Sequence, residues 1–315
     1  MEEKERQWRT WAAREIQQRA LLAYHVLDGL VAQMSGDGTS TRHVANPLIL
    51  PSSEAAFDAS NVDEWLAHMR SQRSFRPLDY QLSAFSLRVI LEGLQSLVSD
   101  SDESDLVAVG VPGRSDVRRA LAQVHETVSM SIHLSAEERL EVLLRWHTIC
   151  LDTMINSTVL FKPGFDMTKW VYTPDARRAL LHAIAIQDII EQLPRGRAHV
   201  IHMPSSLFAA VTIYVVFSLA GVATIHLPRT IAWQDALLSH ADLNIGCDSS
   251  RASTGSETRR FVEEGHTDSP PGLGAVRNLL YEMNSMQKLF RCLISQWGIA
   301  HDMEEIVNQW ITLCH

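Results

Sequence analysis

The sequence predicts an all-α protein, and three features of the chain agree on this. Apolar residues recur every three or four positions through most of the 315 residues, which is the period of an amphipathic helix. No stretch alternates apolar and polar residues between hairpin turns, as a half-buried strand would. The segment from Met203 to Pro228 contains no Asp, Glu, Lys or Arg, which is typical of a helix inside a large helical body. We therefore expect one large multi-helix domain over residues 1–315, packed around that buried apolar helix.

The N-terminal third predicts helices separated by glycine and proline breaks. The first helix covers about residues 4–34 and ends at Ser35-Gly36-Asp37-Gly38, where the glycines release the backbone. An extended segment at 46–51 follows, and Asn61 with Glu64 has the capping-box spacing that begins a helix bearing Trp65. Residues 82–97 form the next apolar stripe. It runs into an acidic, serine-rich stretch at about 99–105, interpreted as a solvated flexible loop, with a phosphorylated switch as the alternative.

The rest of the chain continues the helical pattern. Ser135 and Glu138 form a second capping box, and Thr173-Pro174 has the composition of a helix start. Residues of about 246–274 are mainly Ser, Thr, Gly, Asp, Glu and Pro, which predicts a flexible surface loop. Two helices finish the chain, the first stopped by Gly298 and the second started by a capping box at 302–305.

The charge-free segment from Met203 to Pro228 is also long and apolar enough to suggest a membrane span. Its threonine and serine residues, the early Pro204 and the lack of cationic residues on its N-terminal side favour a buried core helix instead. We therefore expect no membrane association.

Composition favours a globular protein without a nucleic-acid surface of its own. Hydrophobic residues make up 46% of the chain and charged residues 21%, so a substantial core can be buried. The net charge of −9 gives an anionic surface, which repels phosphate backbones. The 4 cysteines are scattered, without the paired spacing of a zinc finger or zinc cluster. The charged first residues do not resemble a secretory leader, so a reducing, intracellular location is expected.

Two charges lie within an apolar stripe on the first helix. The stripe residues share one face at steps of three or four: Trp8, Trp11, Glu15, Arg19, Leu22 and Val26. Glu15 lies one turn before Arg19, which is the favourable orientation for a helical ion pair. The pair is either an ordinary surface salt bridge beside the core or, if the stripe is buried, a pair that must be satisfied inside the protein.

Taken in chain order, several motifs resemble the fungal-specific transcription factor domain, or middle homology region. They form a Trp-x-x-Trp start, a Glu with nearby arginines, a Leu-Asp step, a proline-bounded loop, a Trp/Phe-x-Ala turn at Phe57-Asp58-Ala59, a Trp-His helix, an Ala-Arg helix and a terminal Trp-Gly. The matching positions are Trp8, Trp11, Glu15, Arg19, Asp28, Pro51, Trp65, Trp146, His147, Arg177, Pro204 and Trp297. No single motif is specific, but their order over nearly the whole chain is. The set resembles the branch of the family that follows two-Cys-two-His zinc fingers.

This resemblance implies a transcription regulator in the nucleus that controls a metabolic or secondary-metabolite gene set. Its partners would be a second subunit, in a homo- or heterodimer, or the transcription machinery. The family usually has a zinc DNA-binding module and a further helical stretch before the Trp-x-x-Trp start, whereas Trp8 lies near the first residue here. We therefore expect a domain that is incomplete at its N-terminus and binds no DNA by itself. Zinc and DNA binding would belong to the missing module or to a partner.

The sequence contains none of the common catalytic signatures. It has no Gly-x-Ser-x-Gly, phosphate-binding loop, dinucleotide fingerprint or His-Glu-x-x-His. A terpene synthase would need clustered carboxylates on facing helices, and the acidic residues of 99–105 lie in a loop-like run instead. Histidines near apolar faces (His25, His147, His182 and His226) are interpreted as core or interface residues. We expect no enzymatic activity, catalytic residue, cofactor or metal.

Two alternatives to the regulatory domain remain open. The first is a stand-alone interaction protein that dimerises with, or titrates, a full-length transcription factor, because an exposed Trp8–Trp11 face would seek a partner. The second is a small-molecule sensor, in which the central apolar helices line a pocket for a small hydrophobic effector.

Overall fold

The computed structural model describes residues 2–35, 50–74, 82–102, 112–155, 160, 162–194, 200–239, 242, 256–265 and 275–314. Within them the chain forms thirteen helices and two short strands, so the predicted all-α fold is confirmed. The helices are α1 Glu2–Ser35, α2 Glu54–Phe57, α3 Val62–Ser74, α4 Ala84–Asp102, α5 Arg114–Met130, α6 Ala136–Met154, α8 Met167–Trp170, α9 Pro174–Gln192, α10 Met203–Leu219, α11 Trp233–Leu237, α13 Glu257–Glu264, α14 Leu279–Leu293 and α15 Ile299–Leu313. The strands are β1 Thr224–His226 and β2 Val276–Asn278.

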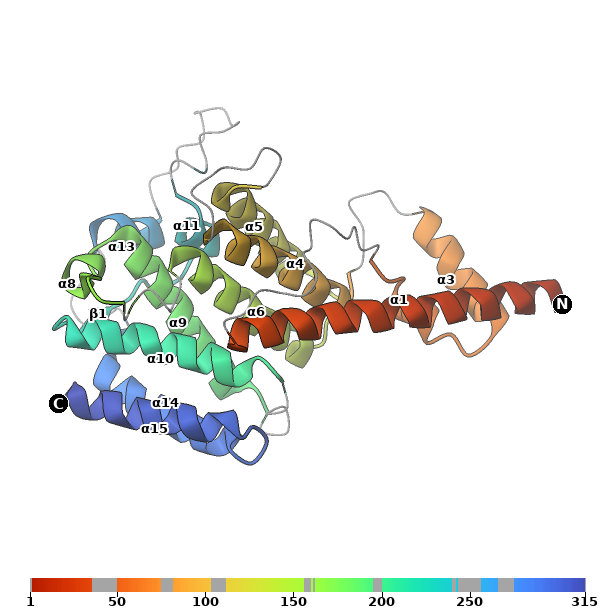
Figure 1. Cartoon of the computed structure of the whole chain (residues 1–315). Coiled ribbons are helices and arrows are strands. Elements are labelled where there is room, and N and C mark those ends of the chain that lie inside the picture. Colours follow the sequence, from red (N-terminus) through yellow and green to blue (C-terminus); the bar gives the residue numbers. More distant parts are fainter. Residues whose placement is uncertain are drawn as a thin grey trace, which may run out of the picture.

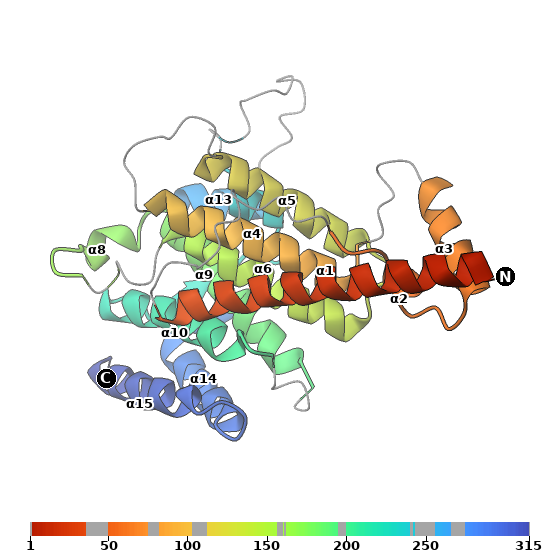
Figure 2. The ribbon, with the colours of Figure 1, turned by 45° about the vertical axis from the view of Figure 1, so that its right-hand side comes forward.

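The helices stack in an order close to that of the sequence (Figure 1). Helices α4 and α5 pack on α6, α6 packs on α9, α9 packs on α10, and α10 packs on α14 and α15. Helix α1 lies along the outer side of α4. Its N-terminal half extends past the rest of the body, with α3 beside it (Figure 2).

The charge-free helix that the sequence places at the centre is α10. Thirteen of its 17 residues are buried, and its Tyr214 hydroxyl donates a hydrogen bond to Gln187 Oε1 at 3.0 Å. Thirteen residues of α9 are buried as well, so the two helices share the centre of the core. No helix in the described part of the chain combines the length and apolarity that a bilayer crossing needs.

Helix α10 ends earlier than the charge-free run does. The chain turns at Gly221, whose φ of 87° is accessible to glycine at little cost, and then forms β1. Strand β1 pairs with β2 in an antiparallel ribbon that sets Ile225 opposite Arg277. This ribbon covers one edge of the helical core, and it is the only sheet among the described residues.

Two predicted helix starts are confirmed in atomic detail. The Ser135 hydroxyl accepts from the Glu138 amide at 3.2 Å, and the Glu138 carboxylate accepts from the Ser135 amide at 2.9 Å. Thr173 accepts from the Ala176 amide at 3.2 Å, with Pro174 as the first helical residue. These short-range bonds satisfy amides that the helix itself leaves unpaired.

Of two other predicted helix starts, the one at Asn61 is confirmed, although its capping box is incomplete, and the one at 302 is wrong. Asn61 accepts from the Glu64 amide at 2.9 Å as expected, but the Glu64 carboxylate accepts from the Ser60 amide instead of completing the box on Asn61. Helix α15 begins at Ile299 with Gly298 as its N-cap, so the predicted start at 302 is wrong. The helix starts a turn earlier because its first turn already packs against the core.

Residues 99–102 are helical and not part of a loop. Helix α4 continues to Asp102, past the buried Leu97 and Val98. Each added residue of an existing helix gains a hydrogen bond without a new nucleation step, so a polar C-terminal turn can extend a buried helix.

The loop predicted at 246–274 contains a helix as well. Ser256 caps the start of α13, Phe261 and Val262 are buried, and Gly265 ends the helix with a left-handed φ of 81°. The polar composition of the segment concealed this helix, because only two apolar residues, Phe261 and Val262, anchor it to the core. The predicted break at 36–38, the extended residues 46–49, residues 103–105 and the remainder of 246–274 lie outside the described residues.

Candidate functional site

Arg19 joins α1 to the segment that precedes α2. Its guanidinium donates to Glu15 Oε1 at 3.0 Å, to Glu54 Oε2 at 2.8 Å and to the Ser52 carbonyl at 3.0 Å. The Ser52 amide in turn donates to Glu15 Oε1 at 2.9 Å, and the Phe57 ring centroid lies 3.9 Å from the guanidinium carbon. The Glu15 and Arg19 side chains are 5% and 13% exposed, so the ion pair is a buried and satisfied one. Three family-like motifs meet here: the Glu with nearby arginines, the proline-bounded loop, whose Pro51 precedes Ser52, and the Trp/Phe-x-Ala turn that begins at Phe57.

The tryptophans of the N-terminal motifs form a small satellite cluster with Ala56 and Ala59. The rings of Trp11 and Trp65 lie 5.5 Å apart, and Trp65 is buried. Because α3 packs on this side of α1, Trp8 and Trp11 are half-buried. The expectation of an open Trp8–Trp11 face is therefore wrong.

We expect Arg19→Gln to lower the free energy of unfolding by roughly 2 kcal/mol, because the buried Glu15 carboxylate keeps one amide donor but loses its cation. The segment at 50–57 should also be cleaved faster in limited proteolysis. Arg9→Gln is the control, since Arg9 makes a similar pair with Glu5 but is 77% exposed. Equal rates of cleavage at 50–57 in the two variants would contradict the anchoring role of Arg19.

Trp146 and His147 lie in a packed aromatic core. The Trp146 indole N–H donates to the Leu121 carbonyl at 2.8 Å. The Nδ1 atoms of His147 and His182 are 2.9 Å apart, so one ring donates and the other accepts. Burial keeps the pKa of His147 well below its ordinary value and lowers the pKa of His182 to about 3, so both rings are neutral at pH 7. Trp233 stacks on His182 with centroids 5.2 Å apart, which leaves a core rather than a ligand site.

The remaining motif residues lie apart from one another. Arg177 donates to the carbonyls of Val262 and Glu263, at 2.6 and 3.1 Å, and so holds the end of α13. Pro204 stands in the first turn of α10, where proline is tolerated. Asp28 is half-buried on α1, and Trp297 is half-buried between α14 and α15. These positions have structural roles and do not form one site.

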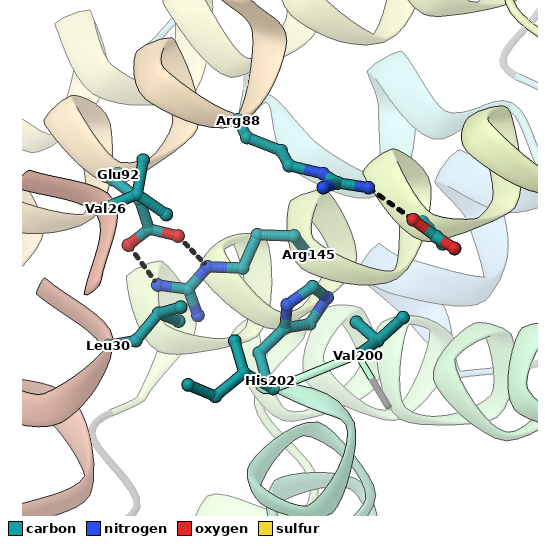
Figure 3. Close-up of a pocket in the computed structure, with 9 residues that line it drawn as sticks. Val26, Leu30, Arg88, Glu92, Arg145, Val200 and His202 are labelled. Atoms are coloured by element: carbon teal, nitrogen blue, oxygen red, sulfur yellow. Dashed lines mark hydrogen bonds and ion pairs between the residues drawn. The ribbon is translucent and has the colours of Figure 1, made fainter. Parts of the chain in front are cut away.

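A cavity of about 280 Å³, lined by both charged and apolar side chains, lies between α1, α4, α6 and the start of α10 (Figure 3). Four helices that are distant in sequence meet around it. The lining residues are Val26, Leu30, Arg88, Glu92, Glu141, Arg145, Val200, Ile201 and His202.

One wall of this cavity is a closed ion-pair network. Arg145 donates to both carboxylate oxygens of Glu92, at 2.6 and 2.7 Å, and the two side chains are 1% and 2% exposed. Its third donor reaches Gln33 Oε1 at 2.7 Å, and Gln33 donates to Asp152 at 2.8 Å. Burial raises the pKa of Asp152 to about 6. The network ties α1 to α4 and α6.

The opposite wall is more open. Arg88 donates to the Glu141 carboxylate, and its side chain is 35% exposed at the mouth of the cavity. His202 is 5% exposed, and its Nε2 atom makes no hydrogen bond of ordinary geometry to the described residues. Burial, with smaller effects from Arg145 and Arg88, keeps the pKa of His202 well below its ordinary value. A hydrogen bond with the Glu141 backbone opposes this lowering, and the result is a neutral imidazole in the lining of the cavity.

These residues were not predicted from the sequence, although a signal was present. Arg88 and Glu92 stand four apart on α4, and Glu141 and Arg145 stand four apart on α6. Both ion pairs join positions 53 residues apart, so the two helices meet in constant register. Oppositely charged pairs at helical spacing, each within an apolar stripe, are the pattern that could have indicated a buried network.

Metal binding receives no support from the described part of the chain, where no group of three or more His, Cys, Asp or Glu is placed to hold an ion. Comparison of the sequence and fold with protein-family models, curated proteins and solved structures finds no match. The resemblance to the transcription-factor domain therefore rests on the motifs alone.

Proposed function

We propose that the chain is the regulatory domain of a transcription regulator of the fungal-specific type, acting in the nucleus through protein contacts. The observation that carries the proposal is the ordered series of family-like motifs, three of which meet in the Arg19 network. The all-helical architecture is compatible with that family. Glu92 and Glu141, the two carboxylates of the cavity, are each bonded to an arginine, which leaves them poorly suited to acid–base catalysis.

The decisive experiment deletes the gene, profiles transcripts and localises a tagged copy. We expect nuclear signal and coordinated loss of expression in a defined gene set, restored by the wild-type gene. A change in one metabolite with unchanged transcripts would instead indicate an enzyme. In a gel-shift assay the purified chain should give no salt-resistant, sequence-specific complex with promoter DNA, because its net charge is −9.

A second candidate function, a stand-alone interaction protein, is favoured by the outer face of α1. Ile16, Tyr24, Leu27 and Val31 are 48–59% exposed, and Ala20 lies among them. At 3.6 residues per turn these five positions fall within an arc of roughly 80°, on the side away from Arg19's network. Together with the neighbouring exposed leucine at 21, they present on the order of 500 Å² of apolar surface per copy.

Two copies would then bury about 1,000 Å², the lower bound for a specific interface. An antiparallel two-fold pairing sets Ala20 opposite the partner's Leu27, a small residue against a large one. We expect light scattering after size exclusion to show a concentration-dependent dimer, and Leu27→Glu to abolish it. Leu313→Glu, at a 70% exposed leucine on α15, should leave it intact. A monomer at all concentrations would exclude this pairing.

A further inference from the structure

We propose that the cavity between α1, α4, α6 and α10 binds a small organic acid, with its carboxylate against His202 and Arg88 and its apolar chain along α1. The proposal deepens the proposed function by naming the chemical class of the effector. Only the regulatory meaning of this binding rests on the proposed function. Binding itself is a property of the purified chain.

The unused hydrogen-bonding capacity of the cavity lies on one side. The Arg145–Glu92 pair is closed, since both carboxylate oxygens and three guanidinium nitrogens already have partners. In contrast, Arg88 Nε is buried without a hydrogen bond to the described residues, and so is His202 Nε2. Ligand oxygens that reach these two nitrogens would satisfy polar atoms that otherwise carry a desolvation cost.

The charges around His202 favour an anionic head over a neutral or cationic one. Arg88 and Arg145 both act on the imidazole as positive charges. His202 also immediately precedes the 17-residue helix α10, whose N-terminus carries a partial positive charge. Glu92 and Glu141 are each bonded to an arginine. A carboxylate would accept hydrogen bonds from Arg88 Nε and from an N–H group of the neutral His202 ring, whereas an amine would have to compete with Arg88 for the Glu141 carboxylate.

The rest of the lining is apolar. Val26 and Leu30 project from α1, and Val200 lies on the other side of the cavity (Figure 3). Ile201 also belongs to the lining. A cavity of about 280 Å³ holds a chain of about six carbons, at the small end of ligand sites. Because α1 supplies part of the wall, an occupied cavity would hold α1 more firmly against α4 and α6, which gives the ligand a route to the surface of α1.

The test compares three probes of equal chain length, hexanoate, hexanol and hexylamine, by calorimetry and thermal shift on the purified full chain. We expect hexanoate alone to bind and to raise the Tm. Arg88→Gln should weaken hexanoate binding at least tenfold. Arg119→Gln is the matched control, because Arg119 is also 35% exposed and ion-paired, to Asp116 on α5. Equal shifts with all three probes, or equal binding by both variants, would overturn the proposal.

A second measurement needs no change at Arg88. In protein with ¹³C-labelled histidine, the ring signal of His202, assigned through His202→Gln, should move on addition of hexanoate and not of hexanol. A stationary His202 signal in the presence of bound hexanoate would refute this site. Such a failure is distinct from failure of the proposed function, which the transcript profile decides alone.

Discussion

Replacing Arg145 with methionine is expected to lower the free energy of unfolding by about 3–5 kcal/mol, because the change leaves the Glu92 carboxylate buried and without its cation. Glu92 loses both of its hydrogen bonds from Arg145, and Gln33 loses one. Neither carboxylate oxygen can turn to solvent, since the Glu92 side chain is 2% exposed. A buried charge of this kind costs more than an average core substitution.

Urea unfolding followed by circular dichroism measures this effect. The double variant Arg145→Met/Glu92→Leu should recover most of the lost stability, because removing both charges also removes their desolvation cost. Arg119→Met, on the exposed pair with Asp116, should change the stability by less than about 1 kcal/mol. A double variant as unstable as the single one would show that methionine packing, and not the stranded carboxylate, causes the loss.

The elements that the sequence predicted well are those with local causes. The starts at Ser135 and Thr173 follow from a hydroxyl and an amide three residues apart, so the spacing alone indicates them. The burial of α10 follows from its lack of charge over a whole helix, although the end of the run, at β1, was not foreseen. Strand β1 needs β2, which lies about fifty residues later, and no local pattern records that pairing.

The cavity could not be located in the same way, since its polar residues come from α4, α6 and α10. In the sequence, Arg88 and Glu92 have the spacing of an ordinary ion pair within one helix. In the folded chain, Arg88 pairs with Glu141 and Glu92 pairs with Arg145, both on α6. The Arg19 network shows the same limit. Its Glu15 was predicted, but Glu54 lies 35 residues away on α2 and joins only in the folded chain.

Acid is expected to destabilise the chain because three buried histidines resist protonation. Burial lowers the pKa values of His147, His182 and His202 in the folded protein, whereas the unfolded chain has the ordinary value of 6.5. Below pH 6.5 the unfolded state therefore binds more protons, so stability is full at neutral pH and falls as the pH decreases. Each histidine contributes up to about 1.4 kcal/mol per pH unit until its folded-state pKa is reached, which for His182 is about 3.

Asp152 opposes this trend over part of the range. Its pKa is raised from 3.8 to about 6 by burial, so between these values the folded state binds the extra proton. The stability gained from the proton on Asp152 offsets about one histidine's share of the stability lost. We therefore expect a net loss on the order of 4 kcal/mol between pH 7 and pH 5, measured by urea unfolding at each pH.

Single substitutions identify the histidines responsible. His182→Asn keeps an amide near the position of Nδ1, opposite His147, but cannot take up a proton. Its stability should therefore depend less on pH between 7 and 5, by about one histidine's share, even if it is less stable at pH 7. His301→Asn changes a 65% exposed ring on α15 and should leave the pH dependence as in the wild type. If His182→Asn and the wild type lose the same stability on acidification, the core histidines do not govern acid unfolding. The next groups to test are then carboxylates such as Asp242, whose pKa is lowered in the folded state by hydrogen bonds from Ser115 and Ser239.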